Sequence, residues 1–265
     1  MINKYLASIR MGFKDMIVYR FHLYMSLITA PLSLLIYYYL WKSIYSYAGQ
    51  AIINGFTFNA LITYYAINTI IGWFVYSEVD AWFEQNIING ELIADLLIPV
   101  NLFSHYFLVH RGYSIFGLMV ETIPFLFIAK LVFNIPIPGF WILMAFILAL
   151  FFAVVLEFMI SYIVGLTAFW LKRITGIRKA RRTIVLFLAG GMLPLSFFPQ
   201  WFQDISFFLP FKYIRDAVVN IWLGNYEIIG MLQIYLLQIL WIGVLGYIIY
   251  LMWKRASKRF SGAGT

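Results

Sequence analysis

Long apolar runs separated by short polar segments dominate this chain, and their length is the first clue to its fold. A helix needs about 20 mainly apolar residues to cross the roughly 30 Å hydrocarbon core of a bilayer. We therefore expect six membrane-spanning helices, over residues 22–44, 56–77, 102–133, 139–171, 183–200 and 230–253. The predicted fold is an all-α integral membrane protein in which residues 1–265 form one transmembrane domain, with spans one and two in 22–77 and spans three to five in 102–200. Small residues in these spans are expected to let neighbouring helices approach closely, namely Gly165, Gly190, Gly191, Gly243 and Gly246.

Residues 200–224 are also apolar, but residues that disfavour helix interrupt them. Pro199, Pro210 and Gly224 divide the segment into pieces of about ten to thirteen residues, which are too short for a crossing. We expect a re-entrant outer hairpin of two short helices between spans five and six, dipping in from the outer face and returning. A hairpin lying flat on the outer membrane surface is the alternative.

The first 20 residues have the pattern of an amphipathic helix. Apolar residues such as Ile2, Leu6, Ile9 and Phe13 recur at three- and four-residue spacing, with polar residues on the other side. A helix over residues 1–20 is expected to lie along the inner membrane surface, its bases against anionic headgroups. The alternative is an extension of the first span into water, which would not need a bulky apolar stripe.

An acidic segment, residues 78–100, follows the second span. It contains nearly half of the chain's 11 acidic residues and no base, and its acids are Glu78, Asp80, Glu84, Glu91 and Asp95. Trp82, Phe83 and Ile87 share one helical face, and Gly90 is suited to end that helix. Anionic headgroups would repel such a helix, whereas a basic groove on a cytoplasmic partner would attract it. We expect a partner-docking helix here rather than an ordinary solvated loop.

Composition and charge support the membrane interpretation and orient it. The chain is 63% hydrophobic and 11% charged, which leaves too few polar side chains to cover a soluble globule. In the predicted six-span arrangement, most of the 19 lysines and arginines fall on one side of the membrane. The four on the other side are Lys42, Lys130, Lys212 and Arg215. The positive-inside rule then puts both termini, the 78–100 segment, the 172–182 loop and the 254–265 tail in the cytoplasm. We expect a multi-pass protein of the cytoplasmic membrane, whose net charge of +8 reflects contact with anionic lipid rather than nucleic acid.

Three runs of sequence resemble ABC-2-type exporter permeases, the transmembrane subunits of type-2 ABC transporters. Residues 87–92 (IINGEL) and 95–100 (DLLIPV) resemble the cytoplasmic segment of that family. Residues 190–202 (GGMLPLSFFPQWF), continuing to Gly224, resemble its fifth span and outer hairpin. Residues 258–262 (KRFSG) resemble its basic tail, and the three runs occur in the family's order.

The resemblance implies a half-transporter that pairs with a second copy or a similar permease and docks on a cytoplasmic ATPase. The acidic segment would be a coupling helix, with docking residues Glu78, Asp80, Trp82, Phe83, Glu84, Ile87, Gly90 and Glu91. The hairpin would be an outer gate over the transport path, formed by Pro199, Trp201, Phe202, Pro210, Phe211, Trp222 and Gly224. Many relatives have an arginine near the position of Gly90, and this chain has none.

The sequence predicts no catalytic residue, bound cofactor or metal site in this chain. The dipeptide Gly-Lys never occurs, so the phosphate-binding motif G-x-x-x-x-G-K-[ST] is absent, and ATP and Mg²⁺ are expected on the partner subunit. His22, His105 and His110 lack the spacing of metal ligands, and there are no cysteines.

Two acidic residues, Glu121 and Glu157, lie within predicted spans. A carboxylate inside a membrane is costly, so it marks either a functional group or a paired one. Glu157 is expected at the depth of Arg111, and Glu121 near mid-membrane, about two turns from Lys130. Structural pairing and a role in moving a proton or substrate both remain open.

Three functions are compatible with the sequence. The first is a permease subunit of an ATP-driven exporter that moves a hydrophobic or amphipathic substrate outward. The second is a proton-coupled secondary transporter, although the two halves show no internal repeat. The third is an intramembrane lipid-modifying enzyme, for which no reactive cluster is apparent. The first explains the docking segment, the missing nucleotide motif and the broken hairpin together.

Overall fold

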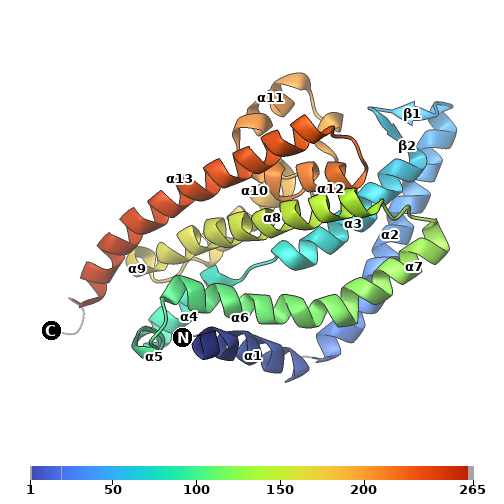
Figure 1. Cartoon of the computed structure of the whole chain (residues 1–265). Coiled ribbons are helices and arrows are strands. Elements are labelled where there is room, and N and C mark those ends of the chain that lie inside the picture. The colour runs from blue at the N-terminus through green and yellow to red at the C-terminus, as the bar shows by residue number, and fades with distance from the viewer. Residues whose placement is uncertain (1, 19, 262–265) are drawn as a thin grey trace.

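The computed structural model describes residues 2–18 and 20–261, most of which are helical (Figure 1). Helices suit a lipid environment because they satisfy their backbone hydrogen bonds internally. The first half of the chain forms α1 (Ile2–Val18), α2 (Arg20–Ala48), β1 (Ile52–Ile53), β2 (Phe56–Thr57), α3 (Phe58–Val75), α4 (Val79–Asn89), α5 (Leu92–Leu97), α6 (Leu102–Gly117), a π-helical turn (Leu118–Thr122) and α7 (Ile123–Phe133). The second half forms α8 (Phe140–Leu166), α9 (Ala168–Leu171), α10 (Thr175–Leu188), a 3₁₀ turn (Leu195–Phe197), α11 (Gln200–Phe208), a second 3₁₀ turn (Phe211–Ile214), α12 (Asp216–Trp222) and α13 (Ile228–Ser261).

The core of the molecule lies around two central helices, α3 and α8. Helix α3 packs against α2, α8 and α12, while α8 also contacts α4 and α13 (Figure 1). Leu61, Ile67 and Ile71 of α3 and Ala149 and Ala153 of α8 are buried at these contacts. The apolar residues of the two helices are therefore enclosed by protein on most sides, whereas α2 and α13 leave most of their surface open.

Five helical segments in the described part of the chain are long and apolar enough to cross a membrane. They are Met25–Ala48, Phe58–Asn89, Leu102–Phe133, Phe140–Leu171 and Ile228–Lys258. Five of the six predicted spans correspond to them, the span at 56–77 being α3 within the second segment. In the second segment the helix breaks at residues 76–78, which separates the α3 span from α4. The multi-pass membrane architecture is confirmed, but the predicted span at 183–200 is not among the five.

The fifth predicted span differs because α10 begins and ends earlier, at Thr175 and Leu188. Its 14 residues cover about 21 Å, less than the hydrocarbon core. Beyond it, Gly190 adopts a φ of +76°, a left-handed conformation that favours glycine. The Tyr64 hydroxyl donates to the Gly190 carbonyl at 2.8 Å, and the Asn68 side chain donates to the Gly191 carbonyl at 2.8 Å. These bonds from α3 hold the chain in a turn, so the helix cannot continue to residue 200.

Short helices form the segment between α10 and α13, as the breaks in the sequence predict. Pro199 precedes α11, Pro210 precedes the second 3₁₀ turn, and Gly224 has a φ of +73° after α12. The two helices have different surroundings: α12 is enclosed against α3 and α8, while α11 keeps Trp201 and Phe208 exposed. The prediction of two short helices is therefore confirmed, and their position in a membrane stays a prediction.

The predicted N-terminal helix is present as α1, and it lies along α6 (Figure 1). The contact uses small residues: a Cβ built at Gly12 would lie 2.0 Å from the Val109 carbonyl oxygen. Ser8 hydrogen-bonds the Nδ1 atom of His105 at 2.9 Å. Leu6 and Met11 remain exposed, and the side chains of Ile2 and Phe13 lie outside the described residues. Leu6 and Met11 are thus open to the surroundings, whereas Ile9 is half-buried.

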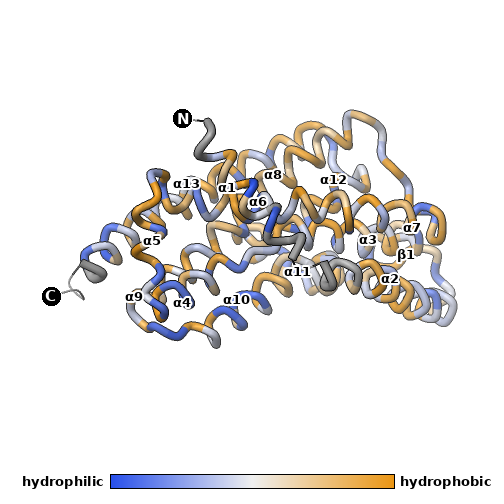
Figure 2. Tube along the Cα trace, turned by 90° about the horizontal axis from the view of Figure 1, so that it is seen from below, coloured by the Kyte–Doolittle hydropathy of each residue, from blue (hydrophilic) through white to orange (hydrophobic). Residues whose placement is uncertain are grey.

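Hydrophilic residues concentrate at one end of the molecule, around α4 and the start of α10 (Figure 2). Helix α9 contacts both α4 and α13, so the acidic segment, the start of α10 and the C-terminal part of α13 lie at that same end. The β1–β2 turn lies at the opposite end (Figure 1).

Candidate functional site

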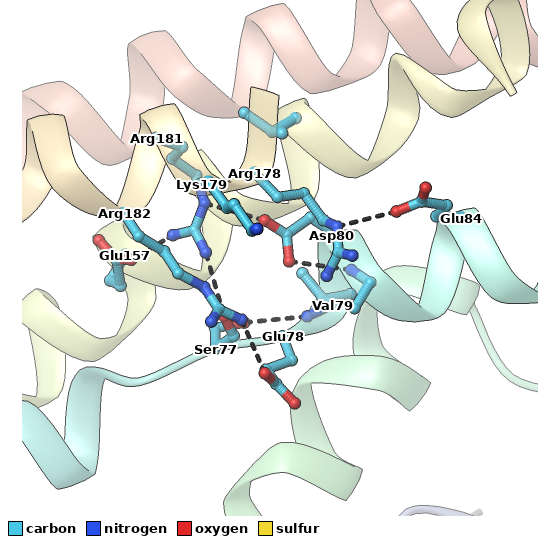
Figure 3. A network of polar contacts seen from close by, with 12 residues as sticks. Ser77, Glu78, Val79, Asp80, Glu84, Glu157, Arg178, Lys179, Arg181 and Arg182 are labelled. Atoms are coloured by element: carbon cyan, nitrogen blue, oxygen red, sulfur yellow. Dashed lines mark hydrogen bonds and ion pairs between the residues drawn. The ribbon is translucent and has the colours of Figure 1, made fainter. Parts of the chain in front are cut away.

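Three arginines of α10 bind three acids from the start of the 78–100 segment. Arg182 pairs with Glu78 at 2.7 Å, Arg181 with Asp80 at 3.0 Å, and Arg178 with Glu84 at 2.9 Å (Figure 3). Residues at positions i, i+3 and i+4 of a helix share one face, so the arginine spacing presents all three guanidinium groups toward α4. Two elements about a hundred residues apart in sequence are thereby held side by side.

Arg181 is the centre of this network. Its Nε donates to Asp80, its Nη1 to Glu157 of α8 at 2.5 Å, and its Nη2 to the Ser77 carbonyl at 3.2 Å. The side chains of Arg181, Asp80 and Glu157 are 4%, 0% and 8% exposed. Buried charges are tolerated when they are paired and hydrogen-bonded, and a guanidinium has enough donors for three acceptors. Arg181 therefore joins α10, the α3–α4 connection and α8 at one point.

Glu84 fixes the beginning of α10. Its carboxylate accepts hydrogen bonds from the backbone N–H of Ile174 at 3.1 Å and the hydroxyl of Thr175 at 2.9 Å, besides its pair with Arg178. The first N–H groups of a helix lack internal partners and carry partial positive charge, so a carboxylate is stabilising there. This contact explains why the predicted 172–182 loop is helical from Thr175 onward.

Helix α4 also packs directly on α8. A Cβ built at Gly165 would lie 2.5 Å from Cδ2 of Phe83 and 3.1 Å from the Cα of Asp80. Phe83 is fully buried among Tyr106, Tyr162 and Phe169. The contact leaves no space between α4 and α8, so the two helices are expected to move together.

Beyond these contacts the segment presents an exposed surface, which we call the α4–α5 corner. It consists of Gln85, Ile88, Asn89, Gly90, Glu91, Ile93, Ala94, Leu96 and Leu97, all solvent-exposed in this structure. Leu97 is the most exposed of its apolar members, at 78%. Underneath, buried Leu92 and the hydrogen bonds of Asp95 with Asn86 and Tyr106 hold α5 in place. The α4–α5 corner is therefore an exposed, largely apolar surface on helices that buried contacts hold in place.

The predicted docking residues divide into three groups by burial. Asp80, Phe83 and Glu84 are buried in the contacts just described, so they do not present a surface to a partner. Trp82 and Ile87 are partly buried, with Trp82 stacked on His110, and Glu78 is half-exposed beside Arg182. Only two of the predicted residues, Gly90 and Glu91, belong to the α4–α5 corner.

Neither the buried ion pairs nor the apolar corner was predicted from the sequence. The bases of the 172–182 loop served only to orient the chain. Asp80 and Glu84 are four residues apart and Arg178 and Arg181 three apart, and both spacings place a pair on one helical face. The acids were also interpreted as the docking feature, whereas the exposed residues are mostly apolar. Complementary charge spacing on two amphipathic helices was the available signal.

A family model decides the identity of the chain. The model described as ABC-2 family transporter protein matches residues 20–264. The chain belongs to this family. It is a multi-pass membrane permease of the ABC transporter type, as its resemblance predicted, and permeases of this family are typically non-catalytic transmembrane subunits. No curated protein sequence matches it.

In this ABC-2 permease the charged side chains within the predicted spans contact other residues than expected. Glu157 binds Arg181, not Arg111. The Nη1 atom of Arg111 donates to the Phe74 carbonyl at 2.9 Å, and its guanidinium lies 5.2 Å from the centre of the Phe107 ring. Glu121 accepts a hydrogen bond from the Ser26 hydroxyl of α2. The expected depth in the membrane suggested Arg111 as a nearby base for Glu157. Its partner Arg181 instead lies in a segment that was expected to be a loop.

The expected gate residues of the permease lie in two separate groups. Trp222 is held inside, donating to the Pro136 carbonyl at 3.2 Å and packing edge-to-face on Phe146. Pro210 is buried and Phe211 partly buried beneath α12. The rest lie at or near the surface, with Phe202 packed on aromatic neighbours; these are Pro199, Trp201, Phe202 and Gly224.

Asp216 fastens the start of α12 to the turn after α10. Its carboxylate lies 3.1 Å from the Tyr64 hydroxyl and accepts from the backbone N–H of Leu195 at 3.1 Å. Its own backbone N–H donates to the Ala189 carbonyl at 3.0 Å. The hairpin is therefore connected to α10 and α3 through buried polar contacts.

Proposed function

We propose that this chain is the permease subunit of an ATP-driven exporter, which moves a hydrophobic or amphipathic substrate outward across the cytoplasmic membrane. In this proposal a separate cytoplasmic subunit binds and hydrolyses ATP with Mg²⁺ and docks on the α4–α5 corner. Two permease subunits, either two copies of this chain or this chain with a similar permease, form the transport path.

The observation that carries the proposal is an exposed apolar surface on a rigid base. Contiguous exposed apolar residues on a folded protein mark interaction sites. Ile88, Ile93, Leu96 and Leu97 gather at the polar end of the molecule, where α4 and α10 carry their charges. Because this end carries the bases, the positive-inside rule supports a cytoplasmic position for it. A cytoplasmic partner suits the corner better than lipid does.

The ion pairs provide a route by which a push on the corner reaches the rest of the permease. A displacement of α4 is transmitted to α10 and α8, since breaking their contacts would leave buried charges unpaired. Helix α10 leads into the turn at Gly190, and the contacts of Tyr64 and Asp216 link that turn to α12. Coupled movement of packed helices is a common form of conformational switching.

The topology in this proposal keeps both termini inside and the hairpin outside. Helix α10 would make the fifth crossing, starting at the cytoplasmic end and completed toward the outer face by the segment up to α12. Helix α13 would then return, which accounts for the contact between its C-terminal part and α9. The burial of α12 within the protein favours a re-entrant hairpin over one lying flat on the membrane.

A proton-driven mechanism has less support. Glu157 is neutralised by Arg181, so pairing explains its position without a transport role. Proton-gradient-driven flux by this chain alone in liposomes would contradict the ATP-driven proposal.

Co-purification of the full chain from its native membrane tests the proposal. We expect a second subunit that contains the G-x-x-x-x-G-K-[ST] motif and hydrolyses MgATP. Leu97→Asp, alone or with Ile93→Asp, should lower the recovery of that subunit about tenfold or more, because a charge is costly in an apolar contact.

Ile52→Asp is the matched control, since Ile52 is an exposed isoleucine in β1 at the opposite end of the molecule. It should leave recovery unchanged. Equal recovery with Leu97→Asp and the control, or the absence of any ATPase subunit, would count against the proposal.

A further inference from the structure

A cavity of about 840 Å³ lies between the end of α3, the start of α4 and one face of α6 with its π-helical turn. Its volume is within the range of small-molecule sites, roughly 300–1,000 Å³. Its lining on α6 and the π turn extends from His110 to Thr122, about 18 Å along a helix axis. The cavity is separate from the α4–α5 corner, and the docking proposal does not use it.

The π turn makes one continuous wall of this side of the cavity. His110 and Thr122 are twelve residues apart, so a regular α-helix would place them about a third of a turn apart. The turn over Leu118–Thr122, in which the Ile123 N–H donates to the Leu118 carbonyl, holds one residue more than an α-helical turn. That extra residue rotates Thr122 back to the face of His110, so both residues line the same cavity. Isolated π turns of this kind occur frequently at functional sites.

Aromatic rings form most of the apolar wall. Those that line the cavity are Trp73, Phe74, Tyr76, Trp82 and Tyr113. Trp82 is stacked on His110 with ring centres 4.2 Å apart, and Tyr113 meets Trp82 edge-to-face. Leu118 is the only branched aliphatic side chain among the described lining residues. Aromatic rings pack on one another more favourably than their area alone provides, so the wall suits a flat aromatic ligand better than a lipid chain.

The charged residues among the described lining are Glu78 and Glu121, and protein groups engage both of them. Glu78 pairs with Arg182 at 2.7 Å and accepts a hydrogen bond from the Tyr76 hydroxyl. Glu121 accepts a hydrogen bond from the Ser26 hydroxyl. An ionic ligand would have to compete with these contacts, so the cavity suits an uncharged one.

Two buried polar atoms of the lining residues have no hydrogen-bond partner among the described residues. They are Nε2 of His110 and Oγ1 of Thr122, at the two ends of the lining on α6 and the π turn. Each residue is only 5% exposed, and a buried polar atom without a partner costs free energy. A ligand with a polar group at each end would supply both partners. A hydroxyl both donates and accepts, so it matches either tautomer of His110 as well as the Thr122 hydroxyl.

We infer that this cavity binds an uncharged, rigid aromatic ligand with a hydroxyl group at each end, one at His110 and the other at Thr122. Two hydrogen bonds of about 2.8 Å take up part of the lining of about 18 Å and leave about 12 Å between the two ligand oxygens. Two phenol rings joined by a two-carbon bridge have this length. The inference deepens the proposed function, because it names the class of substrate. Only in calling the ligand a substrate does it rest on that proposal.

A suitable probe is trans-4,4′-dihydroxystilbene, a rigid pair of phenol rings that is uncharged at neutral pH. The matched ligand trans-stilbene has the same rings without the hydroxyl groups. Binding of both, labelled with tritium, is measured to the full chain in phosphatidylcholine nanodiscs, with binding to empty nanodiscs subtracted. Dihydroxystilbene binding should saturate, and stilbene binding should be about tenfold or more weaker.

Two substitutions remove one ligand partner each and keep the shape of the side chain. His110→Phe retains a ring against Trp82, and Thr122→Val replaces the hydroxyl with a methyl group. Each should weaken dihydroxystilbene binding about tenfold and leave stilbene binding unchanged, which separates a lost hydrogen bond from a distorted cavity. Thr69→Val is the matched control, since the Thr69 hydroxyl donates to the Tyr65 carbonyl outside the cavity. It should leave the binding of both ligands unchanged.

Equal binding of the two ligands to the unaltered chain would overturn the inference. Unchanged dihydroxystilbene binding in either His110→Phe or Thr122→Val would overturn it as well, since both ends of the ligand are assigned. An equal loss of both ligands in these variants would have the same consequence, because it would show a change of cavity shape.

A cysteine placed in the cavity gives a second measurement that keeps His110 and Thr122 intact. The chain has no cysteine, so Ser114→Cys in the lining would be its single thiol. Dihydroxystilbene should slow its reaction with a maleimide, but should not slow that of Ser43→Cys on the exposed face of α2. Absence of protection at Ser114→Cys would overturn the inference.

All of these measurements use the permease without its ATPase. Saturable dihydroxystilbene binding by a chain that co-purifies with no ATPase subunit would therefore refute the proposed function alone. ATPase docking without dihydroxystilbene binding would refute the inference alone.

Discussion

Arg181 is placed between two buried carboxylates, and it is the residue on which the arrangement of the polar end depends. Asp80 and Glu157 come from different elements, and both are buried. Removing one member of a buried ionic group is more costly than removing all of it, since the remaining charges lose their compensation. The three residues should therefore behave as one unit in mutational analysis.

Arg181→Met is predicted to lower the free energy of unfolding by about 3–5 kcal/mol, because it leaves Asp80 and Glu157 buried without a counter-charge. Adding Asp80→Asn and Glu157→Gln to that variant should restore most of the loss. Denaturant unfolding of the full chain in detergent micelles, followed by tryptophan fluorescence, measures both effects.

Lys179→Met is the matched control, since Lys179 is an exposed base of the same helix. Its effect should stay within about 0.5 kcal/mol. A loss with Arg181→Met no greater than the control would show that the network contributes little. A triple variant as unstable as Arg181→Met would show that uncompensated charge is not the cause.

At the scale of the elements, the contact between α4 and α8 is set by one glycine. The sequence predicted that five glycines would permit close helix approach, but it could not rank them. Gly165 is pressed against Phe83, whereas a Cβ at Gly243 would meet no atom within 4 Å, and one at Gly246 would make an ordinary 3.4 Å contact with Met159. A glycine in an apolar helix permits another helix to approach closely. Whether one does depends on which helix packs against that position.

Gly165→Ala is predicted to destabilise the permease by about 1–3 kcal/mol, because a methyl group there overlaps a buried aromatic ring. Gly243→Ala should be neutral or stabilising by up to about 1 kcal/mol, since alanine is the better helix former and space is available. The same unfolding measurement compares the two. Equal effects of the two substitutions would contradict the assignment of Gly165 as the α4–α8 contact.

The elements that the sequence predicted best are those set by local pattern. Five spans, the N-terminal helix and the breaks at Pro199, Pro210 and Gly224 follow from hydropathy and from the restricted backbone of proline and the flexible one of glycine. Helix α10 does not. Its start depends on Glu84, and its end depends on Tyr64 and Asn68 of α3, all about a hundred or more residues away. A single sequence without homologues does not reveal such pairings.

The candidate site illustrates the same limit. The sequence correctly drew attention to residues 78–100, but it interpreted the acids as a surface for a partner. Asp80 and Glu84 instead bind arginines within the chain, and the surface that remains is apolar. Charge composition identified an important segment, while tertiary contacts determined which of its side chains are available.

For the whole molecule, the account requires that the polar end face the cytoplasm. The α4–α5 corner, the start of α10 and the C-terminal part of α13 lie at that end, and the β1–β2 turn lies at the other. An ATPase can push on the corner only if this end is inside the cell. Orientation is therefore the property on which docking, coupling and export all depend.

Single-cysteine labelling in the cysteine-free chain tests that orientation most directly. Gln85→Cys lies on the exposed corner and Asp204→Cys on exposed α11. A membrane-impermeant maleimide is predicted to label Asp204→Cys in intact cells and Gln85→Cys only in inside-out vesicles. Labelling of Gln85→Cys in intact cells would contradict the account.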